Sequence, residues 1–435
     1  MMRLVQGLLE FIEKSPTSFH AVEQVRQELL EHGFQELREQ EMWRLEQGGQ
    51  YFVTRNQSSL IAFQVPRGEI GSFRIVASHS DSPTFKIKEN PEKESSGYVQ
   101  LNTERYGGML CASWFDRPLS VAGRVMIRTD SGEIQSRLVC CGRDLVLIPN
   151  LAIHMNRTVN DGYAYNAQTD MLPLYGGPGA KGSFDREIAS LAGVEPEQVL
   201  CSDLFLYNRM KGTVWGAQNE FISAPRLDDL ECAYTSLQAF LDGNDRPGVP
   251  VYALFDNEEV GSGTKQGADS SFLETVLRRI VSSAGLPEEQ FYAAIASSFM
   301  ISADNAHAIH PNHPDKTDPT NPVRINGGVV MKFNANQKYT TDAVSGAVFR
   351  EICRRAGAPL QTFVNRSDML GGSTLGNIAN SHVSLNTVDI GLPQLAMHSC
   401  YETAGVQDVE AMTRALTTFY NTEITTLADG SYRLS

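Results

Sequence analysis

Histidine and carboxylate side chains follow several apolar segments of this sequence. One apolar segment leads directly into His79 and Asp81. Another, at 251–255, is followed by Glu258 and Glu259. In an open α/β sheet, sites form just beyond the carboxyl ends of the strands, so these side chains are candidates for a shared site. Further candidates are Asp228, at the start of an expected helix, and Asp304, His307 and His398, which come after apolar segments.

The residue types in this set favour metal chemistry. A single histidine after a strand is more often a satisfied polar residue than a ligand, and Glu-Glu pairs are common on surfaces. Five groups of histidine and carboxylate residues in one α/β domain are harder to explain without a shared site. Histidine and carboxylate sets without cysteine are typical of catalytic zinc, cobalt or manganese pairs. Two divalent cations share a site only when several carboxylates balance their charge, one of them bridging.

Common catalytic and nucleotide-binding motifs do not account for this pattern. The sequence contains neither His-Glu-x-x-His nor Gly-x-Ser-x-Gly. The segment 261–267 is one residue too long for the dinucleotide fingerprint, and 177–181 lacks the glycine that precedes the lysine of a P-loop. Both glycine-rich segments are therefore interpreted as turns.

Composition and charge limit the class of protein. The 435 residues are 41% hydrophobic and 20% charged, which is ordinary globular usage and indicates two or three domains. The net charge of -14 disfavours a nucleic-acid or anionic-membrane partner. The seven cysteines include no Cys-x-x-Cys pair, which disfavours a disulfide framework and a zinc knuckle.

The N-terminal segment predicts an amphipathic helix and not a secretory leader. Its apolar residues have the spacing of one helical face, and Glu10 and Glu13 interrupt any leader core. No apolar run approaches the ~20 residues that a membrane helix needs. We therefore expect a soluble, unexported protein of the cytoplasm.

The elements that must position these residues form an interrupted α/β pattern. Alternating strands and helices predict a central, mostly parallel sheet with helices on both faces, formed by residues 1–87 and 217–435. Between them, residues 88–216 predict a β-rich insert domain with a hairpin at 125–128 and 134–139. Strands are expected at 51–53, 60–63, 73–78, 251–255, 328–333 and 383–388, helices at 19–32 and 271–283, and an exposed loop at 172–183.

Seven stretches at these positions closely resemble the aspartyl aminopeptidase family of two-zinc metallopeptidases, and in particular its bacterial members. The stretches run in family order across nearly the whole chain, and their joint occurrence is specific. They are 78–83, 114–119, 149–154, 225–229, 256–262, 302–307 and 394–399.

The resemblance implies a zinc-peptidase-like fold that binds two zinc ions per subunit, for which Co²⁺ or Mn²⁺ can substitute. Asp228 would bridge the two ions. His79 and Asp304 would complete the protein ligands of one ion. Glu259 and His398 would complete those of the other.

The resemblance also implies roles around the metals. Glu258 would be the general base, and Asp81 would orient His79, since residues two apart on a strand project to the same side. Substrate-pocket positions of the family are matched by His307, Lys332 and Tyr339. His154 also matches a pocket position, and because it lies in the insert it could approach the metals or reach a neighbouring subunit's site.

The implied activity is release of N-terminal residues from peptides, with a preference for Asp or Glu. The Lys332 cation could meet such a side chain, and an ordinary strand lysine is the alternative interpretation. Family members assemble through the insert, and tetrahedral dodecamers are known for this fold type. We therefore expect peptide substrates, a homo-oligomer, and no nucleic-acid or membrane partner.

Two other functions use the same residues differently. A broader two-zinc aminopeptidase, or an amidase such as a deacylase, would share the ligands and differ in the pocket. A non-catalytic scaffold is disfavoured because a base such as Glu258 beside metal ligands has no structural use.

Overall fold

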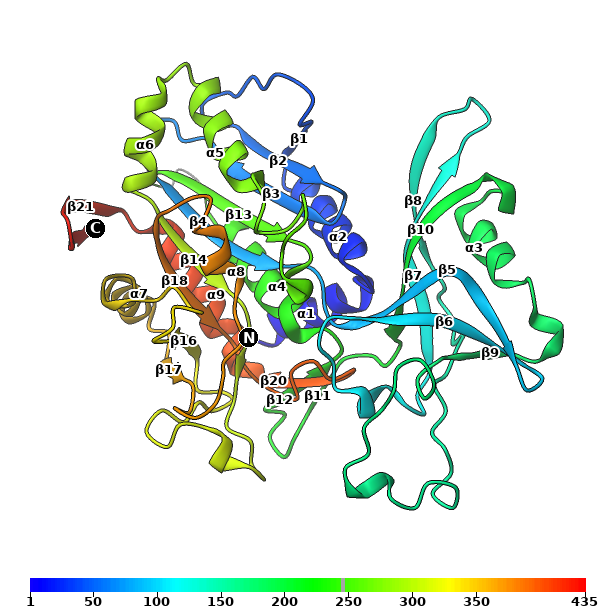
Figure 1. Cartoon of the computed structure of the whole chain (residues 1–435). Coiled ribbons are helices and arrows are strands. Elements are labelled where there is room, and N and C mark those ends of the chain that lie inside the picture. Colours follow the sequence, from blue (N-terminus) through cyan, green and yellow to red (C-terminus); the bar gives the residue numbers. More distant parts are fainter. Residues whose placement is uncertain (244–246) are drawn as a thin grey trace.

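The computed structural model describes residues 1–243 and 247–435. The protein folds into two lobes (Figure 1). The larger lobe contains a nine-stranded sheet with helices on both sides, and the smaller is built on a six-stranded sheet. The predicted α/β class is confirmed. We call the lobes the α/β lobe and the insert.

The nine-stranded sheet is parallel at its centre, where β13, β4, β14 and β18 run in the same direction. The flanking strands β3 and β16 pair antiparallel to this central group. The carboxyl ends of the central strands therefore meet at one edge, where the candidate residues follow. The order is β1 (Gln35–Leu37), β2 (Gln50–Arg55), β3 (Ser59–Gln64), β13 (Val249–Phe255), β4 (Phe73–His79), β14 (Phe299–Ala303), β18 (Asn386–Gly391), β16 (Val329–Phe333) and β17 (Leu360–Val364).

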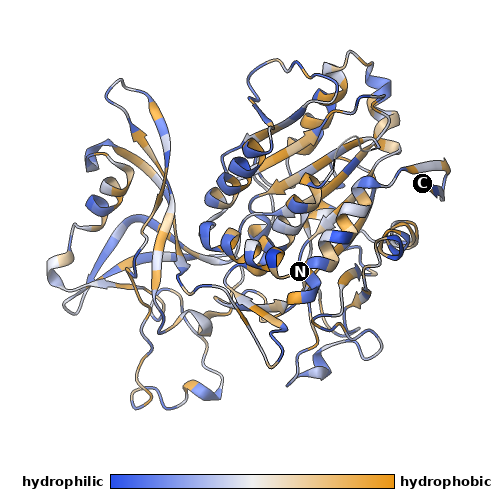
Figure 2. Ribbon diagram, turned by 180° about the vertical axis from the view of Figure 1, so that it is seen from behind, coloured by the Kyte–Doolittle hydropathy of each residue, from blue (hydrophilic) through white to orange (hydrophobic). Residues whose placement is uncertain are grey.

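Alternation along the buried strands divides the α/β lobe into two cores. In β13, Val251 and Ala253 face one core, while Tyr252 and Leu254 face the other. Figure 2 shows the apolar residues concentrated on the sheet and on the helix faces turned toward it. One core is covered by α1 (Met2–Lys14), α2 (Ser18–Glu31), α4 (Leu227–Leu241), α7 (Ala343–Ala356) and α9 (Val406–Asn421). The other is covered by α5 (Phe272–Ser283), α6 (Glu288–Ala296) and α8 (Leu375–Ala379).

The insert has an antiparallel sheet and a hydrophobic core of its own. It contains the predicted hairpin, as β7 and β8. The helix α3 (Phe184–Ala192) packs its apolar face into the same core. The strand order is β8 (Ile134–Cys140), β7 (Leu119–Arg128), β10 (Val199–Asn208), β5 (Thr84–Ser95), β6 (Tyr98–Tyr106) and β9 (Leu174–Gly176).

The strands of the insert span residues 84–208, so the sheet begins and ends slightly earlier than the predicted 88–216. The next strand, β11, already belongs to a third sheet that includes strands from the C-terminal half of the chain. The order of this sheet is β11 (Thr213–Trp215), β12 (Phe221–Ala224), β20 (Glu402–Gly405), β19 (Pro393–Leu395) and β15 (Ala306–His307).

Some predicted elements are displaced. The strand expected at 383–388 begins only at Asn386, because residues 381–385 form a turn after α8 in which Leu385 N donates to the Asn380 side chain. The loop expected at 172–183 contains the short strand β9. A terminal hairpin, β21 (Ile424–Ala428) and β22 (Ser431–Leu434), was not expected. Of the helices in the described ranges, none combines the length and the apolar character needed to span a membrane.

Candidate metal centre

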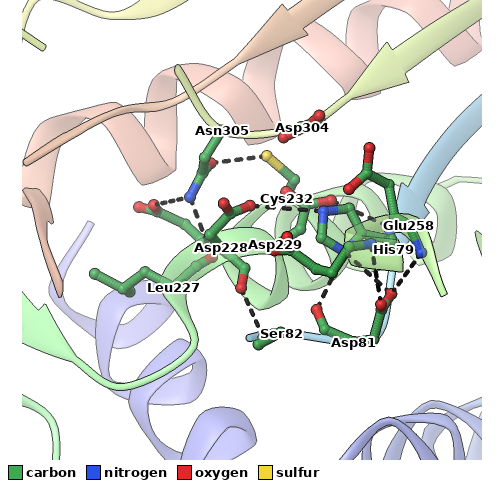
Figure 3. Close-up of polar contacts among 12 residues, drawn as sticks. His79, Asp81, Ser82, Leu227, Asp228, Asp229, Cys232, Glu258, Asp304 and Asn305 are labelled. Atoms are coloured by element: carbon green, nitrogen blue, oxygen red, sulfur yellow. Dashed lines mark hydrogen bonds and ion pairs between the residues drawn. The ribbon is translucent and has the colours of Figure 1, made fainter. Parts of the chain in front are cut away.

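His79 is the last residue of β4, and its side chain is almost completely buried. Its Nδ1 lies 3.1 Å from the backbone oxygen of Asp81 and 3.4 Å from Asp81 Oδ1. This contact turns Nε2 toward Asp228, whose Oδ1 is 3.6 Å away (Figure 3). The backbone N–H of His79 donates to Asp229 Oδ2 at 3.0 Å. The ring is therefore fixed with one nitrogen free to bind a cation.

Asp228 lies at the beginning of α4, where the backbone is not yet helical. Its N–H donates to Glu402 Oε2 at 3.0 Å, and the other oxygen of Glu402 accepts from the backbone N–H of His398 at 2.7 Å. The Nε2 of His398 lies 3.4 Å from Asp228 Oδ2. Glu402, on β20, thus holds the backbone of both residues, and Asp228 meets a histidine on either side.

Glu258 and Glu259 form a short turn that follows β13. Their backbone N–H groups donate to the Asp81 carboxylate at 3.1 and 3.2 Å. The Oε1 of Glu259 lies 3.3 Å from His398 Nε2. The residue that orients His79 therefore also fixes the turn that carries these two glutamates.

Asp304 directly follows β14, and it is held by Lys332 of β16. The Lys332 ammonium donates to the backbone oxygens of Asp304 and Asn305 at 2.7 and 3.1 Å, and it lies 3.8 Å from Asp304 Oδ2. Although burial opposes the charge of Lys332, Asp304 and other anionic neighbours raise its pKa above the ordinary value. Lys332 is 3% exposed, so much of its bonding capacity is used within the fold.

Three groups of these side chains bring one ligand atom from each member within 4.8 Å of one another. His79, Asp228 and Glu259 each belong to two of the groups. All five residues predicted as ligands are members. The groups are His79, Asp228, Asp229 and Asp304; His79, Glu258 and Glu259; and Asp228, Glu259 and His398.

The donor set fits cations. Asp228 Oδ1, Asp229 Oδ1 and Glu259 Oε1 are buried and accept no hydrogen bond from any residue in the described ranges. A buried carboxylate oxygen that accepts no hydrogen bond is costly, and a divalent cation would satisfy it. Cysteine is not a member of any of these groups, as expected for a catalytic centre and not a structural zinc site.

The charges in this cluster depend strongly on one another. Burial raises the pKa of Glu258 to about 8 and that of Glu259 to about 7. Burial opposes protonation of His398, but its contacts with Asp228 and Glu259 raise its pKa to about 11. Without a cation, the cluster therefore retains protons. A cation would replace these protons, which couples metal affinity to pH.

The predicted pocket residues lie in two different places. Tyr339 and His307 both contact the Phe363 ring, with centroids 6.3 and 6.1 Å away, and the Lys332 ammonium lies 5.2 Å from the Tyr339 centroid. These residues therefore line one region beside Asp304. His154 is exposed on a loop of the insert and belongs to none of the three groups.

Some residues that shape the site were not singled out from the sequence. Asp229 binds the backbone of His79, and Glu402 binds that of Asp228 and His398. Tyr106, from the insert, donates to Asp81. Asp229 had a signal, because it neighbours Asp228 in a matched stretch. Glu402 and Tyr106 had none, since their contacts are made across long sequence separations.

The comparison with known families is decisive. The family model described as "Aminopeptidase I zinc metalloprotease (M18)" matches residues 11–420. The chain belongs to this family. It is therefore a zinc-dependent aminopeptidase, a hydrolase, as the seven matching stretches predicted. A relative from Clostridium acetobutylicum named "Probable M18 family aminopeptidase 2" is 48% identical over 97% of this chain and 99% of its own length. A relative of the same name from Ectopseudomonas mendocina is 42% identical over 96% of this chain and 98% of its own length.

Solved structures of M18 aminopeptidases have the same fold. The structure described as the Ape4 and Nbr1 complex superposes with a TM-score of 0.93 at 36% identity, covering 96% of this chain and 85% of that one. The structure described as the S. cerevisiae mApe1 dodecamer gives 0.84 at 29% identity and covers 95% of each chain. The zinc-peptidase-like fold is thereby confirmed.

Proposed function

We propose that this aminopeptidase binds two divalent cations, zinc in the first instance, and releases the N-terminal residue of peptides. The observation that carries the proposal is the position of Asp228 between two groups of ligands. His79 and Asp304 lie in one group, and Glu259 and His398 in the other. Asp228 would bridge the ions, and Asp229 supports the first group by binding the backbone of His79.

Glu258 is proposed as the general base. When bound, the cations supply Lewis-acid polarisation of the scissile carbonyl, a site for the free α-amine, and a water molecule of lowered pKa. The Glu258 carboxylate takes a proton from the attacking water and passes it to the leaving amine. Its backbone is held by Asp81, and a ligand atom of Glu258 lies within 4.8 Å of those of His79 and Glu259, which supports this role.

The test of metal dependence is chelation followed by readdition of metal. Removal of bound metal should abolish hydrolysis of N-terminal amino-acid anilides, and Zn²⁺, Co²⁺ or Mn²⁺ should restore it. Full turnover by a sample verified to be metal-free would contradict the proposal. Acyl amino acids in the same assay separate the aminopeptidase from the deacylase alternative, because a deacylase cleaves substrates without a free α-amine.

A preference for N-terminal Asp or Glu is part of the proposal. The enzyme carries a net charge of -14, so attraction of an acidic side chain requires a local cation. Lys332 supplies one beside Asp304, near His307 and Tyr339. Two of its three N–H groups are donated to backbone oxygens, and the ammonium also lies 3.8 Å from Asp304 Oδ2, so a substrate carboxylate would share this cation with Asp304. Lys332 would then contribute both to the position of Asp304 and to selectivity.

Assembly through the insert is also proposed, with a second copy of this chain as the partner. The loop that carries His154 exposes three apolar side chains: Leu151 is 56%, Ile153 48% and Met155 74% exposed. Burial of this loop against another subunit would remove them from water and would bring His154 toward that subunit's site. The S. cerevisiae relative is described as a dodecamer, which supports a tetrahedral dodecamer here. The cytoplasm is the proposed compartment.

A further inference from the structure

The carboxylate of Asp81 collects contacts from three separate parts of the chain. Its Oδ1 lies 3.4 Å from His79 Nδ1 and accepts the Glu258 N–H at 3.1 Å. Its Oδ2 accepts the Glu259 N–H at 3.2 Å and the hydroxyl of Tyr106 at 2.7 Å. The first three contacts belong to the α/β lobe. The fourth and shortest comes from the insert.

Tyr106 binds both Asp81 and the residue that precedes the two glutamates. It is the last residue of β6, and its ring packs edge-on against Phe205 of β10 at 5.6 Å, which fixes it to the insert sheet. Its hydroxyl donates to Asp81 and accepts from Asn257 Nδ2 at 2.8 Å. Asn257 immediately precedes Glu258. The hydroxyl therefore links Asp81 to the residue at which the turn begins.

The chain after Tyr106 continues along the metal centre. Gly107 has a φ of +75°, and a Cβ at this position would lie 3.2 Å from Glu259 Cβ. Leu110 N then donates to the backbone oxygen of His398 at 3.0 Å. The segment 106–110 thus contacts Asp81, Glu259 and His398 successively. The insert is therefore in direct contact with two of the proposed metal ligands, Glu259 and His398.

Asp81 and the turn border a cavity. Asp81, Tyr106 and Asn257 all line a cavity of about 470 Å³ between the insert and the α/β lobe. Beside this cavity, the Tyr106 ring packs against Phe205, and the Asp81 and Asn257 side chains are held by hydrogen bonds to the Tyr106 hydroxyl. Loss of one bond leaves room for the carboxylate to move or to bind water.

We infer that Tyr106 is a positioning residue through which the insert holds Asp81, and the turn that carries Glu258 and Glu259, in place beside His79. The inference rests on the proposed roles of His79, Glu258 and Glu259. The Tyr106 hydroxyl bonds Asp81 and Asn257, neither of which is a proposed metal ligand. Residues that orient metal ligands in this way typically contribute ten- to a hundredfold in activity or metal affinity.

The test is Tyr106→Phe, which removes only the hydroxyl. Its matched control is Tyr207→Phe: Tyr207 lies in the same insert sheet and lines the same cavity, but its hydroxyl donates to Cys141 O at 2.9 Å. We expect Tyr106→Phe to lower kcat or zinc affinity about ten- to a hundredfold, with KM little changed. Tyr207→Phe should retain wild-type values. Zinc affinity is measured by competition with a chelator, and oligomer size by light scattering.

A second variant tests the hydrogen bond between Asn257 and the Tyr106 hydroxyl while leaving Tyr106 unchanged. Asn257→Asp removes the amide that donates to the hydroxyl, and it should lower the same parameter in the same direction. Wild-type kcat and zinc affinity in both variants would overturn the inference, as would equal losses in Tyr106→Phe and Tyr207→Phe. These outcomes leave the proposed function intact if the wild type remains zinc-dependent. Failure of the wild type to require metal would instead refute the proposed function.

Discussion

The carboxylate of Asp228 lies between two imidazole rings, with Oδ1 3.6 Å from His79 Nε2 and Oδ2 3.4 Å from His398 Nε2. The two histidines come from opposite ends of the chain, and each is also placed beside another carboxylate. This arrangement supports the proposal that Asp228 bridges two cations.

Substitution of Glu258 by Gln should leave metal content near normal and lower the rate ~10²–10⁴-fold, the usual contribution of a general base. Glutamine keeps the shape of the side chain but cannot accept the proton of the attacking water. The control is Glu274→Gln, a partly exposed residue of α5 paired with Arg278, which should keep the wild-type rate. Retained activity, or loss of metal in a folded Glu258→Gln variant, would remove Glu258 from this role.

Lys332→Met should change specificity as well as rate. Removal of its charge should weaken transition-state stabilisation for N-terminal Asp and Glu substrates by about 1.5–3 kcal/mol. This loss corresponds to a decrease in kcat/KM of roughly ten- to more than a hundredfold. Cleavage of N-terminal Leu and Ala should fall less, and only because Asp304 loses its support. The measurement is kcat/KM on all four substrates, with the exposed Lys338→Met as the control variant.

Two results would contradict the acidic preference. One is a wild-type enzyme that prefers N-terminal Leu. The other is a Lys332→Met variant in which all four substrates lose the same factor. The second result would restrict Lys332 to holding Asp304.

Assembly should depend on the loop that carries His154. Replacing Leu151, Ile153 and Met155 together by Ser removes apolar surface that a neighbouring subunit would bury, so the oligomer should become smaller. Light scattering measures the size. Leu191→Ser is the control, because Leu191 is 41% exposed on α3 of the same insert and lies outside the loop. An unchanged oligomer in the triple variant would place the interface elsewhere.

Removal of the metals should make stability fall as pH rises. Burial raises the pKa of Glu258 and Glu402 to about 8, so the folded metal-free chain binds more protons than the unfolded chain between about pH 5 and 8. His398, whose pKa is raised to about 11, adds the same trend above pH 6.5. Asp228, whose pKa lies below its ordinary value, is ionised throughout this window.

The midpoint of urea unfolding at pH 5.5 and 8.5 measures this effect. The metal-free enzyme should lose stability at the higher pH. The zinc-loaded enzyme should lose less, because cations replace the protons and bind more tightly as the ligands deprotonate. A metal-free enzyme that gains stability between these pH values would show that the cluster does not retain protons.

Much of the fold could be predicted from hydrophobic patterning. Apolar segments such as β4 and β13 are buried on both faces, so they stand out without any alternation of polar residues. Their parallel pairing then places His79 beside the Glu258–Glu259 turn, since both follow carboxyl ends at one edge of the sheet. The sequence boundaries of the insert were less predictable, because its first strand, β5, begins immediately after the matched stretch that contains His79 and Asp81.

Contacts between distant segments could not be predicted in this way. His398 reaches Asp228 through a turn with a φ of +66° beyond β18, so the residue pattern marked it only as a candidate and its role came from the family resemblance. Glu402 contacts Asp228 across 174 residues, and nothing in the sequence around either position signals the bond. Tyr106 reads as an ordinary strand residue, and its role depends on how the insert sits against the α/β lobe.

The most direct test of the two-cation proposal is an anomalous-difference map from a crystal of the zinc-loaded enzyme. The arrangement of Asp228 predicts two peaks about 3.5–4 Å apart, one on either side of its carboxylate. One peak should be bound by His79 and Asp304, and the other by Glu259 and His398. A single peak, or two peaks that do not share Asp228, would contradict the proposed bridged centre.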